Sequence, residues 1–313
     1  MEDQAEKLRE IMRKRKSISA ADPSGAPAGG KDRIRSHPHF SGNGNKDRKT
    51  RIITVTSGKG GVGKTNLSVN MALSFARIGK KVVLMDADLG LANINVMLNM
   101  IPKYNLYHVI KKQKTIREIL AETEYGISVV AGASGFSQIA NMGEEDRHNF
   151  ISEIDTLSFA DIIIIDTSAG VSSNVLDFIA AADDAVVITT PEPTAITDAY
   201  GIIKIIATEY ESIKLELKLV VNRAKSASQA KSVADRMITI AGQFLNIKVD
   251  YLGFIYDDHV VATAVQAQKP FTVIDPKCRA SVCVQHLVER MDKSEIDGSD
   301  GVGSIFKKLF NRS

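Results

Sequence analysis

A glycine-rich stretch that ends in Lys64 and Thr65 holds the first residues whose types and spacing can do chemistry. Residues 58–65 fit the pattern G-x-x-x-x-G-K-[ST], after an apolar β-branched run and before a helical pattern. In this setting successive backbone N–H groups converge on phosphate oxygens, and the positive end of the helix dipole strengthens their field. We expect the Lys64 ammonium to contact the β- and γ-phosphates of a nucleotide and the Thr65 hydroxyl to bind Mg²⁺.

A glycine-rich turn before a helix is the alternative interpretation of this stretch. That interpretation leaves the order of strand, loop, Lys-Thr and helix unexplained, so we favour a nucleotide site with ATP and Mg²⁺ as its ligands. The residues expected to bind the nucleotide here are Gly58, Lys59, Gly60, Gly61, Val62, Gly63, Lys64, Thr65 and Asn66.

Two carboxylates stand one residue apart at the end of a second apolar run, which begins at Lys81. At a strand end, Asp86 and Asp88 can both face the γ-phosphate and its metal ion. We expect Asp88 to orient or deprotonate the attacking water and Asp86 to support the Mg²⁺ shell. A simple acidic turn is the alternative.

Asp166 follows four isoleucines in a third run, 162–165. This pattern matches the strand that presents a Walker B carboxylate, so we expect Asp166 to hold Mg²⁺ through water. An unpaired carboxylate directly behind a buried strand would be costly, which favours a metal over a structural role. Gly170 would let the following loop respond to the presence of the γ-phosphate.

Asn222 and Arg223 follow a fourth run, 217–221. A side-chain amide at this point can offer a donor and an acceptor to the adenine edge, and we favour base recognition by this pair. A turn-forming asparagine is the alternative.

Lys59 adds a second lysine to the loop, which then reads K-G-G-x-G-K-T. This resembles the deviant P-loop of the MinD/ParA/nitrogenase-iron-protein class of ATPases, in which the earlier lysine reaches the phosphates bound to the facing subunit. The resemblance implies an ATP-bridged homodimer in which Lys59 acts catalytically in the partner's site, as an arginine finger does. A solvated loop lysine is the alternative.

The resemblance to MinD-type ATPases extends from Lys59 through Arg223. Residues 86–95 (DADLGLANIN) and 166–170 are especially close to that family. The chain departs from it at Ser168, where the family more often has proline.

These residues need a sheet that brings several strand ends to one edge. Apolar strand patterns alternate with amphipathic helical ones, which predicts an α/β fold with a doubly wound, mostly parallel sheet of the P-loop NTPase type. The expected strands are Arg51–Thr56, Lys81–Asp86, Ile127–Ala131, Asp161–Asp166, Ala185–Thr190, Leu217–Asn222 and Val249–Ile255. The expected helices include Lys64–Ile78, Asp146–Leu157, Asp198–Glu209 and Ser228–Phe244.

Composition limits the classes of protein that fit. The chain has 313 residues and a net charge of +3, with 12 Lys and Arg against 7 Asp and Glu in residues 1–50 and 28 against 30 in the rest. A nearly neutral body argues against a generic nucleic-acid coat, and no specific nucleic acid is expected. Two cysteines make no disulfide framework, and no run approaches the ~20 apolar residues of a spanning helix. With no signal-peptide pattern at Met1, we expect a cytoplasmic protein.

The chain divides into five predicted parts. Residues 50–291 form the ATPase domain, and residues 17–49 and 292–301 have the polar composition of flexible linkers. The remaining parts are short helices at the two ends, residues 1–16 and 302–313.

The N-terminal part begins with Asp3, Gln4 and Ala5, followed by Leu8 and Arg9. This is similar to the N-terminal DQA motif of the FlhG family (also called FleN or YlxH), the ATPases that set flagellar number. In that family the segment stimulates the SRP-type GTPase FlhF. The resemblance implies FlhF as a partner, with Gln4 helping to position water in the partner's site.

The C-terminal part predicts a basic amphipathic helix. Its apolar positions fall at helical spacing, with Lys307, Lys308 and Arg312 on the other side. Such a helix favours reversible binding to membrane lipids, and docking on its own domain is the alternative. The residues expected to contact lipid are Val302, Ile305, Phe306, Leu309 and Phe310.

Together these patterns favour an ATP-dependent dimerising switch that controls flagellar number or placement. We expect it in the cytoplasm and reversibly at the inner face of the cell membrane, with the flagellar switch complex or a flagellar transcription regulator as a further partner. Three alternatives stay open at this point: a MinD-type division-site ATPase, a ParA-like DNA-partition ATPase, and a non-catalytic adaptor shaped by ATP.

Overall fold

The computed structural model describes residues 50–88, 93–132, 149, 152–209 and 215–294. The N-terminal motif and the C-terminal apolar stripe lie outside the described residues. The same holds for residues 146–148, 150 and 151 of one predicted helix.

The described strands form one sheet of eight, in the order β3-β4-β2-β5-β1-β6-β7-β8. All neighbouring strands are parallel except β3 and β4. The predicted mostly parallel α/β sheet is therefore confirmed. The strands are β1 (Arg51–Ser57), β2 (Val82–Ala87), β3 (Leu120–Glu122), β4 (Ser128–Val130), β5 (Ile162–Ala169), β6 (Asp184–Thr189), β7 (Glu216–Ala224) and β8 (Asp250–Tyr256).

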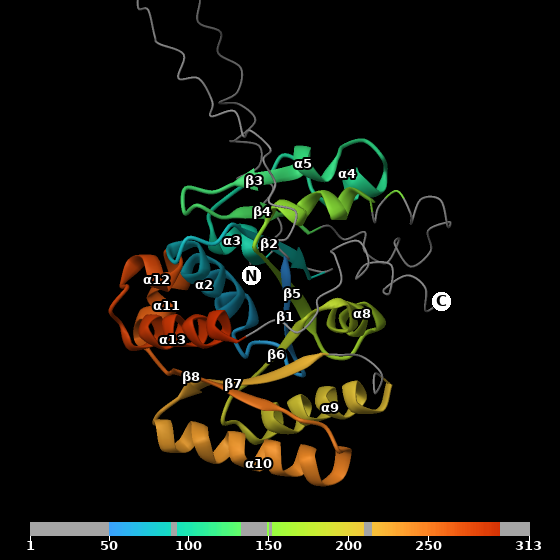
Figure 1. Cartoon of the computed structure of the whole chain (residues 1–313). Helices are drawn as coiled ribbons and strands as arrows, with labels where there is room; N and C mark the ends of the chain where they lie inside the picture. The colour runs from blue at the N-terminus through green and yellow to red at the C-terminus, as the bar shows by residue number, and fades with distance from the viewer. Residues whose placement is uncertain (1–49, 89–92, 133–148, 150–151, 210–214, 295–313) are drawn as a thin grey trace, which may run out of the picture. The chain divides into compact units, whose positions relative to one another are not determined.

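Helices cover both faces of this sheet (Figure 1). One face carries α2 (Lys64–Arg77), α3 (Asn93–Met97), α11 (His259–Gln266), α12 (Phe271–Ile274) and α13 (Arg279–Lys293). The other carries α4 (Leu106–Ile110), α5 (Ile116–Ile119), the 3₁₀ helix η1 (Thr156–Phe159), α8 (Ser173–Ala181), α9 (Pro193–Glu209) and α10 (Ala227–Leu245).

Burial on two faces explains the continuous apolar runs. Every residue of β1 is buried, because Ile53 and Val55 pack under α2 while Ile52 packs on the opposite face. The strand ends that carry the predicted chemistry all lie at the carboxyl edge of the sheet.

Most predicted strand and helix ends differ from the observed ones by one to three residues, for example at β5, which ends at Ala169 and not at Asp166. Two differences are larger. Helix α9 begins at Pro193, not at Asp198, because proline fits the first turn of a helix, where its missing N–H costs nothing. The three residues of β3 were not predicted; they pair antiparallel with β4 at the sheet margin.

A buried ion network closes the amino edge of the sheet. The Arg51 guanidinium donates to both carboxylate oxygens of Asp184, at 2.6 and 2.9 Å, and to the Met291 carbonyl at 2.6 Å. It also donates to the Ser294 hydroxyl at 2.9 Å, and the Lys218 ammonium lies 3.4 Å from Asp184. The first and last described parts of the body are thus joined directly.

Candidate functional site

The loop between β1 and α2 forms a phosphate-binding turn. Gly61 and Gly63 have φ values of 78° and 100°, in the left-handed region that favours glycine. Gly63 caps α2 without a side-chain hydrogen bond, so the cap residue leaves the first N–H groups of the helix available. These groups form the anion-binding end that the sequence pattern predicts.

Two glycines of the loop are required by close packing. A Cβ on Gly63 would lie 2.5 Å from the Asn222 amide nitrogen, and a Cβ on Gly58 would lie 2.2 Å from the Asp198 backbone. The loop therefore rests directly on the end of β7 and on helix α9.

Lys64 is the buried lysine of the loop. Its Nζ donates to Ser57 Oγ at 2.9 Å, and only 9% of the residue is exposed. Burial lowers the pKa of the Lys64 ammonium, and the carboxylates of Asp166 and Asp88 oppose that shift. Lys64 therefore lies within the electrostatic reach of both predicted carboxylates.

Asp86 and Asp166 stand side by side on adjacent strands, as register partners of β2 and β5. Burial, followed by the charge of Asp166, raises the pKa of Asp86 to about 7. Burial also raises the pKa of Asp166 to about 6, against hydrogen bonds from Thr65 and Ser68. Two buried carboxylates in this position need a proton or a cation between them.

The donor set of this pair fits Mg²⁺. Asp166 Oδ2 is buried without a hydrogen-bond partner, while Oδ1 accepts from the Ser68 hydroxyl at 2.8 Å. Mg²⁺ is usually held by one or two carboxylates together with substrate phosphates and water. Thr65, Asp86 and Asp166 would hold the ion at the start of α2. Among the described residues no cluster of three or more His, Cys, Asp or Glu forms a cage for a metal.

Asp88 lies just beyond the pair, at the end of β2. Its backbone N–H donates to Asp86 Oδ1 at 3.0 Å, and its Oδ2 accepts from the Asn93 amide at 3.1 Å. Sequence reasoning did not single out Asn93 or Ser68, although both stand close to predicted site residues along the chain.

Lys59 has a different environment from Lys64. Its side chain is 38% exposed, and its Nζ contacts Glu192 at 3.1 Å and Thr194 Oγ1 at 2.8 Å. Both partners lie at the start of α9, and Glu192 also lies 3.9 Å from the Arg223 guanidinium. The loop thus carries one buried and one exposed cation.

Asn222 braces the phosphate loop in this structure. Its Nδ2 donates to the Val62 carbonyl at 2.8 Å, and its Oδ1 accepts from the Arg223 N–H at 2.8 Å. Arg223 itself has a φ of 54°. Base recognition by this pair stays a prediction.

Three other sequence expectations can be placed on the described residues. The two cysteines, from which no disulfide framework was expected, are the buried free thiols of Cys278 and Cys283. No described helix has the length and apolarity that crossing a membrane requires. Helix α13 ends at Lys293, two residues beyond the predicted end of the ATPase domain.

Comparison with known proteins agrees with this arrangement. Residues 53–271 match the family described as the CobQ/CobB/MinD/ParA nucleotide binding domain. The chain is 34% identical over 243 residues to "Antiactivator FleN" of Pseudomonas aeruginosa, covering 77% of this chain and 86% of that protein. It is also 34% identical over 267 residues to "Flagellum site-determining protein YlxH" of Helicobacter pylori, covering 83% and 90%.

Among solved structures, the fold resembles septum site-determining MinD from Pyrococcus horikoshii complexed with Mg-ADP. The TM-score is 0.63 at 22% identity, covering 78% of this chain and 96% of that one. The sheet of this chain and the helices on it thus share the fold of that protein. The chain belongs to the CobQ/CobB/MinD/ParA family of nucleotide-binding domains, as a P-loop ATPase of the FleN/YlxH (FlhG) group.

Proposed function

We propose that this chain is an ATP-dependent dimerising switch that controls the number or placement of flagella. The observation that carries the proposal is the contrast between the two loop lysines. Lys64 is buried within its own site, whereas Lys59 is exposed, with Glu192 and Thr194 holding its ammonium. An exposed cation at the mouth of a phosphate loop supports a role for Lys59 in the site of a second subunit.

Each residue of the site has a role in that switch. ATP with Mg²⁺ supplies a phosphoryl group whose transfer to water needs charge neutralisation and an oriented nucleophile. The loop N–H groups and Lys64 would bind the phosphates, and Thr65, Asp86 and Asp166 would hold the ion. Asp88 orients the attacking water and accepts its proton.

Dimerisation would complete this site. In the proposed dimer Lys59 exchanges its contacts with Glu192 and Thr194 for the phosphates bound to the partner. A cation that arrives only with the partner makes hydrolysis depend on assembly. The ATP-bound dimer and the monomer are then two states whose populations the nucleotide sets.

The test compares Lys59→Ala with Lys64→Ala. We expect Lys59→Ala to bind ATP as a monomer with nearly unchanged affinity, but to lose ATP-dependent dimerisation and at least tenfold of its hydrolysis rate. Lys64→Ala should lose ATP binding itself. Light scattering and phosphate release measure these outcomes, and a Lys59→Ala protein that dimerises and hydrolyses like the wild type contradicts the proposal.

The flagellar role is supported by the two relatives that are 34% identical to this chain. One is named an antiactivator and the other a flagellum site-determining protein. Residues 3–5 would stimulate FlhF, and residues 302–313 would bring the ATP-bound dimer to the inner face of the membrane. A chain without residues 1–16 should fail to stimulate FlhF GTPase activity, and one without residues 302–313 should not sediment with anionic vesicles.

A division-site function is the second candidate, because the chain is also 32% identical over 243 residues to septum site-determining MinD of Bacillus subtilis. Deleting the gene separates the two roles. Altered flagellar number with normal septa supports the flagellar role, whereas minicells support the division role.

A further inference from the structure

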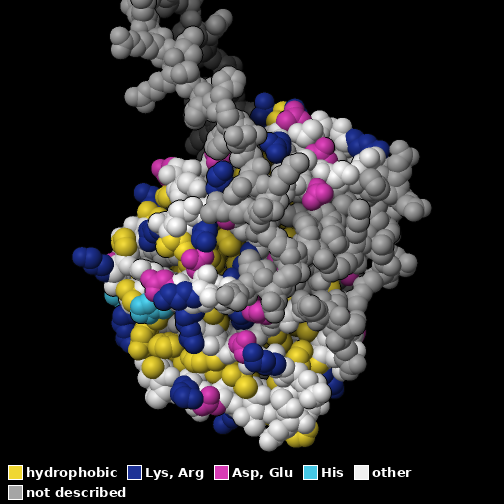
Figure 2. Space-filling view, viewed as in Figure 1, with side chains coloured by type: hydrophobic (Ala, Val, Ile, Leu, Met, Phe, Trp, Pro, Cys, Tyr) yellow, Lys and Arg dark blue, Asp and Glu magenta, His cyan; other side chains and the backbone are white. Residues whose placement is uncertain are grey.

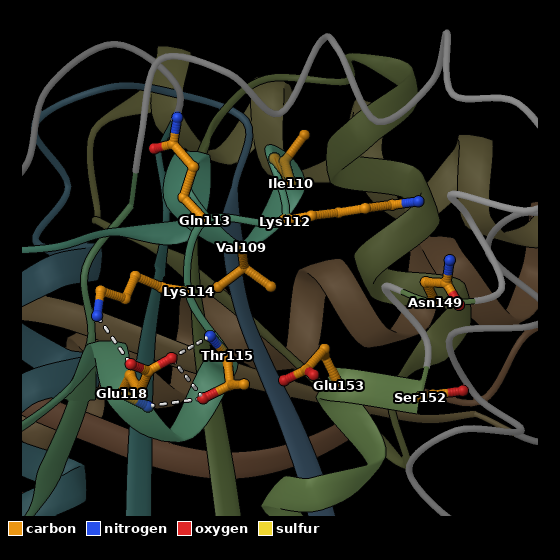
Figure 3. Close-up of a pocket in the computed structure, with 10 residues that line it drawn as sticks. All are labelled: Val109, Ile110, Lys112, Gln113, Lys114, Thr115, Glu118, Asn149, Ser152 and Glu153. Carbon is orange, nitrogen blue, oxygen red and sulfur yellow. Dashed lines mark hydrogen bonds and ion pairs between the residues drawn. The ribbon is translucent and has the colours of Figure 1, made fainter.

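A pocket of about 350 Å³ beside α4 and α5 is separate from the nucleotide site, and none of the described site residues lines it (Figure 3). Its Glu118 carboxylate already accepts from the Lys114 ammonium and from the Thr115 N–H, each at 2.8 Å. On the face shown in Figure 2, basic and acidic side chains of the described residues are intermingled. A buried polar contact to which no role has been assigned lies elsewhere, between helix α2 and strand β5.

Ser68 and Asp166 form this contact. Ser68 Oγ donates to Asp166 Oδ1 at 2.8 Å, and the two residues are 0% and 1% exposed. The other oxygen of the carboxylate, Oδ2, is buried without a hydrogen-bond partner. The serine therefore occupies one oxygen of the carboxylate and leaves the other oxygen to a cation.

The Ser68 hydroxyl has one hydrogen and two acceptors within reach. The second acceptor is the Lys64 carbonyl, at 3.0 Å, four residues earlier in the same helix. In a regular helix that carbonyl already accepts the N–H of Ser68. A hydrogen bond to an ionised carboxylate is about twice as strong as one between neutral groups. The hydrogen is therefore directed to Asp166 when this carboxylate is charged, as it is when it holds a metal ion.

Ser68 lies behind Thr65 on the same side of α2. The two residues are three positions apart, or about 4.5 Å along the helix axis. Thr65 belongs to the first turn, next to the phosphate loop, and both hydroxyls contact Asp166. Thr65 can therefore bind the ion itself, whereas Ser68 can act on the ion only through the carboxylate.

We propose that Ser68 is a positioning residue for Mg²⁺, because its hydroxyl orients Asp166 so that Oδ2 faces the ion or a water molecule bound to the ion. Hydrogen bonds from neighbouring groups to the ligands of a metal fix the direction of those ligands and strengthen metal binding. This role requires only the magnesium-nucleotide site, and neither dimerisation nor a flagellar partner enters it.

A serine that only satisfies its own helix is the competing interpretation, and Ser74 is an example of one. Ser74 is 5% exposed, and its hydroxyl donates to the Asn70 carbonyl at 2.8 Å, four residues earlier in α2. It thus repeats the contact of Ser68 with the Lys64 carbonyl. Because Ser74 lies about 9 Å further along the helix axis, Ser74→Ala is the matched control.

The test titrates Mg²⁺ into the full chain with the fluorescent nucleotide mant-ADP, and fluorescence anisotropy measures nucleotide binding. We expect Mg²⁺ to strengthen binding of mant-ADP to the wild type. Ser68→Ala should need about tenfold more Mg²⁺ for half of this effect, because a ligand of the ion has lost its supporting hydrogen bond. The affinity of Ser68→Ala for mant-ADP in EDTA should equal that of the wild type, since the phosphate loop is unchanged. Ser74→Ala should match the wild type in both measurements.

The proposal is overturned if Ser68→Ala needs no more Mg²⁺ than the wild type, or if Ser74→Ala shows the same shift. It is also overturned if the affinity of Ser68→Ala falls as much in EDTA as in Mg²⁺, because that result indicates a general structural role. Wild-type binding of mant-ADP that does not respond to Mg²⁺ would refute the metal site and the role of Ser68 together. A Mg²⁺ response that depends on Ser68 in a chain that never dimerises would support this role and contradict the dimerising switch.

Discussion

At the scale of single residues, the carboxylate pair of Asp86 and Asp166 dominates the site. The two side chains are almost completely buried on neighbouring strands, and the pKa of each is raised, to about 7 and about 6. Burying a second negative charge beside the first is costly unless a proton or a metal ion accompanies it. The pair therefore destabilises the folded protein when nucleotide and metal are absent. Bound Mg²⁺ would remove that destabilisation.

This cost predicts a pH dependence of stability. Because both pKa values lie above the unfolded value of 3.8, the folded protein holds more protons than the unfolded one between 3.8 and about 7. Its free energy of unfolding should then fall as the pH rises through that range. In Asp86→Asn the free energy of unfolding should decrease much less over this pH range. At about pH 8 the variant should be more stable than the wild type by on the order of 2 kcal/mol.

Urea denaturation with EDTA and without nucleotide measures the effect. Asp235→Asn, at an exposed position on α10, is the control and should follow the wild-type pH profile. A wild-type stability that rises between pH 4 and pH 7 would contradict the assignment.

At the scale of elements, helix α2 is fixed by a polar clamp to α12. Asn70 Oδ1 accepts from both the N–H and the hydroxyl of Thr272, at 3.0 and 2.9 Å, and the Asn70 Nδ2 donates to the Asn66 carbonyl at 2.7 Å. Both side chains are buried. The clamp thus connects the first turn after the phosphate loop to a segment two hundred residues later in the chain.

Asn70→Ala should lower the free energy of unfolding by about 2–3 kcal/mol, because it leaves two buried donors of Thr272 without an acceptor. Gln243→Ala, at an exposed amide on α10, should change it by less than about 0.5 kcal/mol. Equal effects of the two substitutions in chemical denaturation would show that the clamp contributes nothing specific.

At the scale of the whole molecule, the ion network at the amino edge holds the body together. Arg51 and Asp184 are 4% and 1% exposed, and their ion pair joins β1 to β6. Lys218 connects β7 to this pair, and the Met291 carbonyl connects α13 to it. Arg51 and Ser294, close to the first and last residues of the described body, are consequently neighbours. They stand at the edge opposite the nucleotide site.

Asp184→Ala should lower the free energy of unfolding by about 3–5 kcal/mol, because it leaves the buried Arg51 guanidinium without its carboxylate. Asp235→Ala breaks an exposed ion pair with Lys231 and should lower the free energy of unfolding by less than about 1 kcal/mol. Thermal and urea unfolding measure both, and a small loss in Asp184→Ala would mean that the network is replaceable.

The sequence by itself determined seven of the eight described strands and the phosphate loop. Buried parallel strands appear as unbroken apolar runs, and the loop from Gly58 to Thr65 acts through consecutive backbone groups. Because the carboxyl ends of parallel strands share one edge, the meeting of Lys64, Asp88 and Asp166 could also be expected from the chain.

Only the tertiary structure decided which side chains of distant segments lie next to each other. That β2 lies next to β5, which makes Asp86 and Asp166 partners, depends on a crossover that no local pattern encodes. The same is true of Glu192 beside Lys59, and of Asn222 under the phosphate loop. A side chain's hydrogen-bond partner is set by packing between distant segments, whereas periodicity records only which face of its own element it occupies.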